Sequence, residues 1–104
     1  MHKVTIEQIE ARIKQKYFFN LGAAINSQCP DATTADIKKA SLTTVCVLIL
    51  DNDFVIEGKS SCVDFRLYDE MKGQLYAYEN AVEKLWELEG YLLKNKLYEA
   101  NNGI

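Results

Sequence analysis

The chain has little of what most catalytic and metal sites are built from. Its 104 residues include one histidine and one proline, and its three cysteines never stand as Cys-x-x-Cys. The single histidine, His2, sits in a terminus expected to fray. This excludes Cys-His and Ser-His-Asp catalysis as well as a histidine-rich metal site. Glycine-rich phosphate loops and paired catalytic carboxylates are also missing. We therefore expect no enzymatic activity, no metal and no cofactor.

The sequence also lacks a long hydrophobic run and an excess of positive charge. Its longest unbroken apolar stretch is residues 45–50, whereas a membrane-spanning helix needs about 20 apolar residues. The first ten residues contain no apolar h-region, so we expect neither a membrane partner nor a secretion signal. The net charge of −3 disfavours direct nucleic-acid binding. The length suits a single domain over residues 1–104, and the odd cysteine count suits a reducing cytosol.

Local signals predict a first helix over residues 6–17. Thr5 and Gln8 form a capping box, in which the Thr5 hydroxyl accepts the Gln8 amide N–H and the Gln8 side chain reaches back. The apolar residues that share one face of this helix are Ile6, Ile9, Ile13 and Tyr17. Residues 22–41 are rich in loop formers, so a long loop is predicted there, with a helical turn near residues 36–40 as an option.

The middle of the chain predicts a β-hairpin over residues 43–61. Its two arms are rich in β-branched residues, and Asn52-Asp53 is placed in a two-residue turn, where glycine would be preferred to Asp53. The core face in this register comprises Val45, Val47, Ile49, Phe54, Ile56, Gly58 and Cys62. A second apolar face, which also needs cover, comprises Cys46, Leu48, Leu50 and Val55.

Residues 65–98 predict a long helix capped by Asp64, with a bend near residues 87–90 because Gly90 weakens it. Its apolar stripe comprises Leu67, Met71, Leu75, Tyr78, Val82, Leu85, Trp86, Leu88, Leu92 and Leu93. The predicted fold is α+β: an antiparallel β-hairpin, with a third strand from the N-terminal third as an option, packed against this helix and the shorter N-terminal one.

Glu89 is predicted to project into the middle of that apolar stripe. A carboxylate there needs a partner or water. Together with Trp86 it is a candidate ligand-binding residue. The alternatives are that a bend at Gly90 turns Glu89 outward, or that Glu89 pairs with Lys59 or Arg66.

Three glutamates and two tyrosines of the same helix are candidate partner-binding residues. Glu79, Glu83 and Glu87 form a like-charged row at i, i+4 spacing. Such a row can meet a basic partner or imitate phosphates, although a charge row is more often only a solvated face. Tyr76 and Tyr91 project away from the apolar stripe, and exposed tyrosines are common interface anchors. Burial of both tyrosines under the loop is an equally weighted alternative.

Residues 43–64 and 78–93 resemble the gene-49/gene-66 family of small tailed-phage proteins. In the hairpin the matching residues are Thr44, Val45, Cys46, Val47, Leu48, Leu50, Asn52, Phe54, Gly58, Ser60 and Cys62. In the helix they are Asp69, Gly73, Glu79, Asn80, Ala81, Lys84, Trp86, Leu88, Glu89, Gly90, Tyr91, Leu92 and Leu93. Asp53 stands where the family has a turn glycine, and Glu87 where it has a helix proline. The resemblance implies a phage or prophage origin and work in the cytoplasm of a bacterial host, and it implies no established activity.

The expected function is that of a non-enzymatic phage accessory protein that binds and inhibits a host protein or ribonucleoprotein, most concretely a defence complex such as a CRISPR effector. One alternative is a nucleotide-binding sponge with a pocket at an oligomer interface near Glu89. Another is a minor structural phage protein. Because a two-stranded sheet is not stable alone, a homodimer is also predicted, through paired hairpins or packed long helices.

Overall fold

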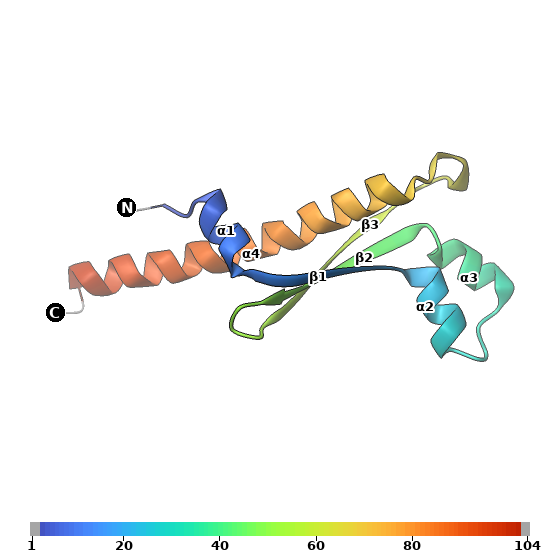
Figure 1. The fold of residues 1–104 in the computed structure, drawn as a ribbon, viewed down its shortest axis with the longest axis horizontal. Coiled ribbons are helices and arrows are strands. Elements are labelled where there is room, and N and C mark those ends of the chain that lie inside the picture. The colour runs from blue at the N-terminus through green and yellow to red at the C-terminus, as the bar shows by residue number, and fades with distance from the viewer. Residues whose placement is uncertain (1–2, 103–104) are drawn as a thin grey trace.

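The fold was obtained as a computed structural model that describes residues 3–102; His2 lies outside the described residues. In chain order the elements are α1 (Ile6–Arg12), β1 (Ile13–Asn20), α2 (Leu21–Gln28), α3 (Thr34–Ala40), β2 (Thr43–Leu50), β3 (Val55–Ser61), a 3₁₀ turn (Phe65–Leu67) and α4 (Glu70–Asn102). The strands form one antiparallel sheet in the order β1-β2-β3, and α4 crosses one face of it (Figure 1). The predicted α+β class is confirmed, and so is the optional third strand.

α1 begins as predicted but ends at Arg12, where the chain continues as strand β1. Thr5 Oγ1 accepts the Gln8 N–H at 3.2 Å, and Gln8 Oε1 accepts the Thr5 N–H at 2.9 Å. The predicted helix over residues 6–17 is therefore wrong beyond residue 12. Residues 13–20 form their backbone hydrogen bonds with β2. The four-residue spacing from Ile13 to Tyr17 suited a helix face, but in a strand side chains alternate between the two faces.

The segment predicted as a loop at residues 22–41 contains two helices. Asn20 Oδ1 caps α2 by accepting the Ala23 N–H at 3.1 Å, and Thr33 Oγ1 caps α3 by accepting the Asp36 N–H at 3.1 Å. The predicted helical turn in this segment is confirmed and extended to Thr34–Ala40. The loop prediction is otherwise wrong because α2 and α3 support each other, side by side at one end of the sheet (Figure 1).

The hairpin is present, but its turn is one residue longer than predicted. The Leu50 N–H donates to the Phe54 carbonyl at 2.9 Å, and the Asp53 N–H donates to the Leu50 carbonyl at 3.0 Å. Asp53 has φ 70°, the left-handed conformation that aspartate tolerates better than most residues. Leu48 consequently lies opposite Ile56, whereas a two-residue turn at Asn52-Asp53 would place it opposite Glu57. A shift of one residue exchanges the two faces of a strand.

The core lies on the face of β2 that contains Cys46, Leu48 and Leu50, which was predicted as the second apolar face and not as the core face. Its buried residues are Ile9, Cys46, Leu48, Leu50, Ile56, Ala77, Ala81 and Leu85. Val45, Val47 and Ile49, which were predicted to be core, lie on the opposite face and are half-buried. The prediction of the core face of β2 is therefore wrong, whereas Ile56 and Gly58 of β3 are buried as predicted. The three-residue turn shifts the pairing by one residue, so these two β3 residues share a face with Cys46 and Leu48 of β2.

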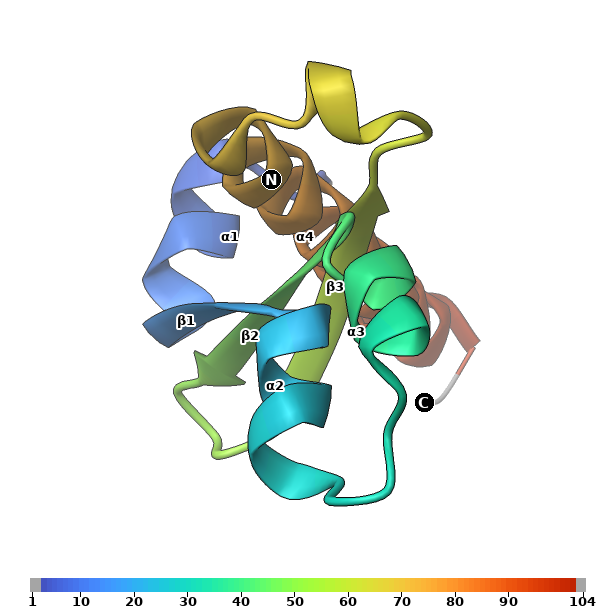
Figure 2. The same cartoon turned by 90° about the vertical axis from the view of Figure 1, so that its right-hand side faces the viewer.

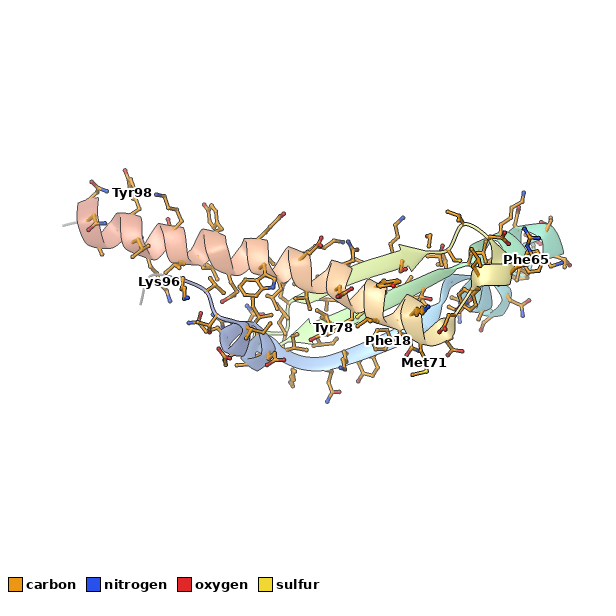
Figure 3. The ribbon with its side chains drawn as sticks, turned by 90° about the horizontal axis from the view of Figure 1, so that it is seen from above. Phe18, Phe65, Met71, Tyr78, Lys96 and Tyr98 are labelled. Atoms are coloured by element: carbon orange, nitrogen blue, oxygen red, sulfur yellow. The ribbon has the colours of Figure 1, made fainter. Side chains whose placement is uncertain are left out.

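α4 runs without interruption from Glu70 to Asn102, so the predicted bend at residues 87–90 is wrong. With Glu87 in place of a proline, nothing interrupts the helical hydrogen bonds. The helix also starts later than predicted: Asp64 caps the 3₁₀ turn, and Asp69 caps α4 by accepting the Lys72 N–H at 3.1 Å. Its C-terminal part, with Lys96 and Tyr98, extends beyond the sheet, and the molecule measures 61 × 27 × 20 Å (Figure 3).

Small residues let α4 lie directly on the sheet. A Cβ atom added to Gly58 of β3 would lie 2.3 Å from the Ala81 nitrogen and 2.6 Å from the Ala77 carbonyl oxygen. Tyr78 and Phe18 pack between α4 and β1 (Figure 3), and burial raises the pKa of the Tyr78 hydroxyl. Only part of the predicted stripe is packed this way, because Leu67, Met71 and Leu75 remain more than half exposed.

Candidate functional site

The five candidate partner-binding residues share one exposed side of α4. At about 100° per residue, Tyr76, Glu79, Glu83, Glu87 and Tyr91 fall within about a third of the helix circumference, opposite the buried Ala81. All five side chains are exposed. Within residues 3–102 none of the three glutamates forms an ion pair. The structure thus brings these five residues into one continuous surface, which we call the outer stripe.

Two residues beside the outer stripe protect the β3 edge, which is one of the two edges of the sheet. Lys84 Nζ donates to the Glu57 carbonyl at 2.6 Å, and Asn80 Oδ1 accepts the Lys59 N–H at 3.0 Å. An unpaired strand edge otherwise invites pairing with another chain. α4 therefore closes the β3 edge against pairing with another strand, whereas β1 forms the other edge of the sheet.

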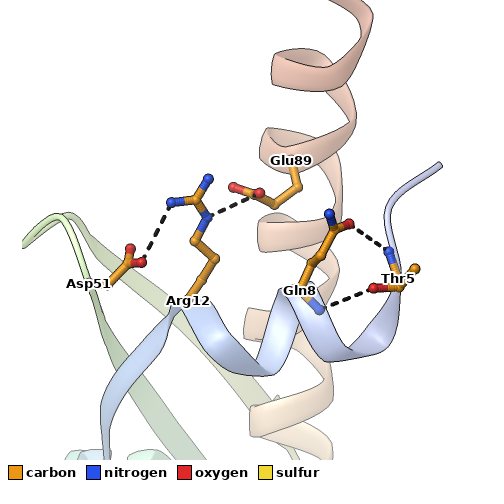
Figure 4. Close-up of polar contacts among 5 residues, drawn as sticks. All are labelled: Thr5, Gln8, Arg12, Asp51 and Glu89. Atoms are coloured by element: carbon orange, nitrogen blue, oxygen red, sulfur yellow. Dashed lines mark hydrogen bonds and ion pairs between the residues drawn. The ribbon is translucent and has the colours of Figure 1, made fainter. Parts of the chain in front are cut away.

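Glu89 lies inward as predicted, but its partner is Arg12 and neither Lys59 nor Arg66. Arg12 Nε donates to Glu89 Oε1 at 3.1 Å, and the Glu89 side chain is only 13 % exposed (Figure 4). Arg12 also lies 3.5 Å from Asp51 Oδ2 at the hairpin turn. The hydrogen bond and charge of Glu89 raise the pKa of the Arg12 guanidinium. The Glu89 carboxylate therefore joins α4 to α1.

The structure does not bring Trp86 and Glu89 together in one hollow. The small hollow of about 220 Å³ beside Glu89 is lined by Gln8, Ala11, Arg12, Asp51 and Glu89. Trp86 points elsewhere on α4 and is partly exposed. Among the residues that the structure describes, Trp86 therefore does not line the hollow that contains Glu89.

Arg12→Ala is expected to lower the free energy of unfolding by about 1–2 kcal/mol, because it leaves the mostly buried Glu89 carboxylate without a partner. The loss of stability is small because the Arg12 side chain is itself partly exposed, so solvent screens its charge. In a double-mutant cycle with Glu89→Ala, urea unfolding should give a coupling energy of about 1 kcal/mol. Lys14→Ala, which removes an exposed pair with Asp53, serves as the control and should have no measurable effect. Additive effects of the Arg12 and Glu89 changes would contradict the pairing.

A larger hollow, which the sequence analysis missed, lies at the other end of the molecule. Its volume is about 710 Å³ and its surface is mostly apolar. It is lined by Asn20, Ala23, Asn26, Ala35, Ile37, Lys38, Lys39, Ser41, Leu42, Phe65 and Tyr68. It was missed because residues 22–41, which supply much of its lining, were predicted to form a loop. The one available signal was the Asn20 cap, whose spacing to Ala23 marks the start of α2.

None of the helices over residues 3–102 is both long enough and apolar enough to pass through a membrane. No group of three or more histidine, cysteine or acidic side chains that could hold a metal ion is found there.

The chain matches a known family of phage proteins. Residues 4–97, from the start of α1 into the last turns of α4, match the family described as "Phage protein (N4 Gp49/phage Sf6 gene 66) family". No curated protein and no solved structure matches the chain. Because the match covers the whole sheet, α1 and most of α4, the chain belongs to the N4 Gp49/phage Sf6 gene 66 family of phage proteins.

Proposed function

We propose that this phage-family protein binds a host macromolecule through the outer stripe of α4 and inhibits it, most concretely a bacterial defence complex such as a CRISPR effector. The observation that supports the proposal is the outer stripe itself. Its three glutamates and two tyrosines are exposed and contribute nothing to the buried core. Tyrosines at both ends of an acidic row combine anchoring side chains with a charge pattern.

The charge of the outer stripe suits a basic groove. Like charges at i, i+4 cost a helix a few tenths of a kcal/mol per pair, and no ion pair within residues 3–102 offsets that cost. A partner rich in lysine and arginine would offset it. Effectors that hold nucleic acid do so in positively charged channels, and a straight row of carboxylates presents such a channel with a regular negative charge.

The test is phage plating on cells that carry an active CRISPR system directed against that phage. Expression of the native chain is expected to raise the plating efficiency by orders of magnitude. The triple variant Glu79→Lys/Glu83→Lys/Glu87→Lys is expected to lose this protection. The triple variant Glu7→Lys/Asp31→Lys/Glu99→Lys is the matched control, because it changes the net charge equally at exposed residues away from the outer stripe. It should protect like the native chain.

Two results would contradict the proposal. One is a native chain that gives no protection against any defence system of a host that the phage infects. The other is equal loss of protection in both triple variants, which would assign the effect to net charge rather than to the outer stripe. Circular dichroism of both purified variants checks that each retains its helix content.

The hollow of about 710 Å³ favours small-ligand binding as a second candidate function. Its size suits a small organic molecule, and Lys38 and Lys39 at its lining suit an anionic group. Native mass spectrometry of the purified chain should then show a bound nucleotide or related anion, which Lys38→Glu/Lys39→Glu should release. A ligand-free spectrum together with no thermal shift across a nucleotide panel would contradict this function.

A further inference from the structure

The sheet has a second apolar face, on the side away from α4. The register places Tyr17 opposite Val47, Phe19 opposite Val45, and Ile49 opposite Val55. We call this surface the open face; its apolar residues are Tyr17, Phe19, Val45, Val47, Ile49 and Val55. Tyr17 is 56 % exposed and Val55 is 50 % exposed. Three strands therefore contribute to one uncovered apolar surface.

The sequence of β2 is that of a strand covered on both faces. A sheet with one solvated face alternates apolar and polar residues, whereas a strand buried on both faces is continuously apolar. Residues 45–50 form the longest apolar run of the chain. α4 and α1 cover one face, and α2 and α3 lie at one end of the sheet (Figure 2). The second face of β2 therefore lacks the cover that its sequence favours.

The size and shape of the molecule agree with missing cover. Its accessible surface is 7788 Å², whereas a compact monomer of this mass exposes about 5,950 Å². The radius of gyration is 17.8 Å, against about 13 Å for a compact domain of this length. Part of the excess of roughly 1,800 Å² belongs to the segment of α4 that extends beyond the sheet (Figure 3). The whole excess is of the size that one subunit buries in an obligate dimer.

We propose that the open face packs against the open face of a second copy of this chain, in a two-fold symmetric dimer of face-to-face sheets. A two-fold interface needs a self-complementary surface. The open face meets this need, because its apolar centre is bordered on β3 by one residue of each sign, Glu57 and Lys59. A two-fold axis can bring Glu57 of one copy to Lys59 of the other.

Other surfaces suit a second copy less well. Packing two outer stripes together would set Glu79, Glu83 and Glu87 against the same glutamates, and like charges across an interface disfavour binding. The β3 edge is already closed by Asn80 and Lys84. The open face contains none of these residues, so this proposal does not depend on the proposed host target.

The test is the mass of the purified chain by light scattering at micromolar concentration, with a monomer mass of 11.9 kDa as reference. The native chain is expected at twice that mass. Tyr17→Glu should raise the dimer dissociation constant about 100-fold or more, because it puts a charge into a desolvated apolar centre. Tyr91→Glu introduces the same charge on α4, where the tyrosine is 72 % exposed, and should leave the dimer intact.

A monomeric native chain would overturn the proposal, and so would a dimer that survives Tyr17→Glu but dissociates on Tyr91→Glu. Val55→Glu is the second variant, in case the first does not fold, since half of the Val55 surface is exposed in the protomer. Circular dichroism of each variant separates loss of the dimer from loss of the fold. Because these readouts need no host component, a failed plating assay and a failed dimer remain distinguishable.

Discussion

Replacing Gly58 with alanine is expected to lower the free energy of unfolding by about 3 kcal/mol, at the upper end of the usual cost of overpacking. The added Cβ would lie 2.3 Å from the Ala81 nitrogen and 2.6 Å from the Ala77 carbonyl oxygen. Both atoms belong to the backbone of α4, so no change of side-chain rotamer can make room. The helix has to move away from β3, and the buried contacts beside it weaken. For a domain with a total stability of about 5–15 kcal/mol, that is a large fraction.

Gly90→Ala is the matched control for this change. A Cβ added at Gly90 meets nothing within 4 Å, and the residue lies inside α4. Alanine is favoured over glycine in a helix interior by about 1 kcal/mol, so this variant should be more stable than the native chain. Urea unfolding followed by circular dichroism measures both. Equal effects of the two substitutions would mean that α4 does not contact the sheet at Gly58.

Leu85→Ala is expected to lower the free energy of unfolding by about 3 kcal/mol. Leu85 is fully buried between α4 and the sheet, and truncating a buried leucine typically costs about 2–5 kcal/mol through lost transfer energy and the cavity left behind. Leu92 lies seven residues further along the same helix and is almost half exposed. Leu92→Ala should cost less than about 1 kcal/mol, because little apolar surface is returned to water.

Thermal and urea unfolding of these two variants test how far α4 is packed. The sequence placed both leucines in one apolar stripe, whereas the structure buries one of them and exposes the other. Similar losses of stability at both positions would contradict this difference. A loss at Leu92 alone would mean that the sheet lies against the C-terminal half of the helix.

Local signals in the sequence predicted local structure well. The Thr5–Gln8 capping box gave the start of α1. The long apolar period of α4 gave its existence and approximate length. Each of these features depends on residues within a few positions of one another, so sequence spacing carries the information.

Features that depend on distant residues were not predicted. β1 resembled a helix because Ile9, Ile13 and Tyr17 are four residues apart, and only pairing with β2 makes it a strand. The register of the hairpin depended on Asn52, because a two-residue turn needs a positive φ at both Asn52 and Asp53, whereas only Asp53 adopts one here. Arg12 and Glu89 are 77 residues apart, so their ion pair could not be recognised from spacing.

The candidate sites likewise differ in how far they could be predicted from the sequence. The outer stripe could be predicted because helical periodicity alone places Tyr76, Glu79, Glu83, Glu87 and Tyr91 on one side. The open face was not predicted as a free surface, because the register error assigned its β2 residues, Val45, Val47 and Ile49, to the core. The hollow beside α2 and α3 depends on helices that were predicted as a loop. Surfaces made by one element are predictable from sequence, whereas those made by several are not.

The two faces of the sheet have different proposed roles: one holds α4, and the other binds a second copy of the chain. The most direct test is an isotope-filtered NOE experiment on a mixed sample of ¹³C-labelled and unlabelled chains. It should show contacts between copies from the Val45 and Val47 methyl groups to the Tyr17 and Phe19 rings. Contacts between copies that arise only from α4 methyl groups, or none at all, would contradict the account.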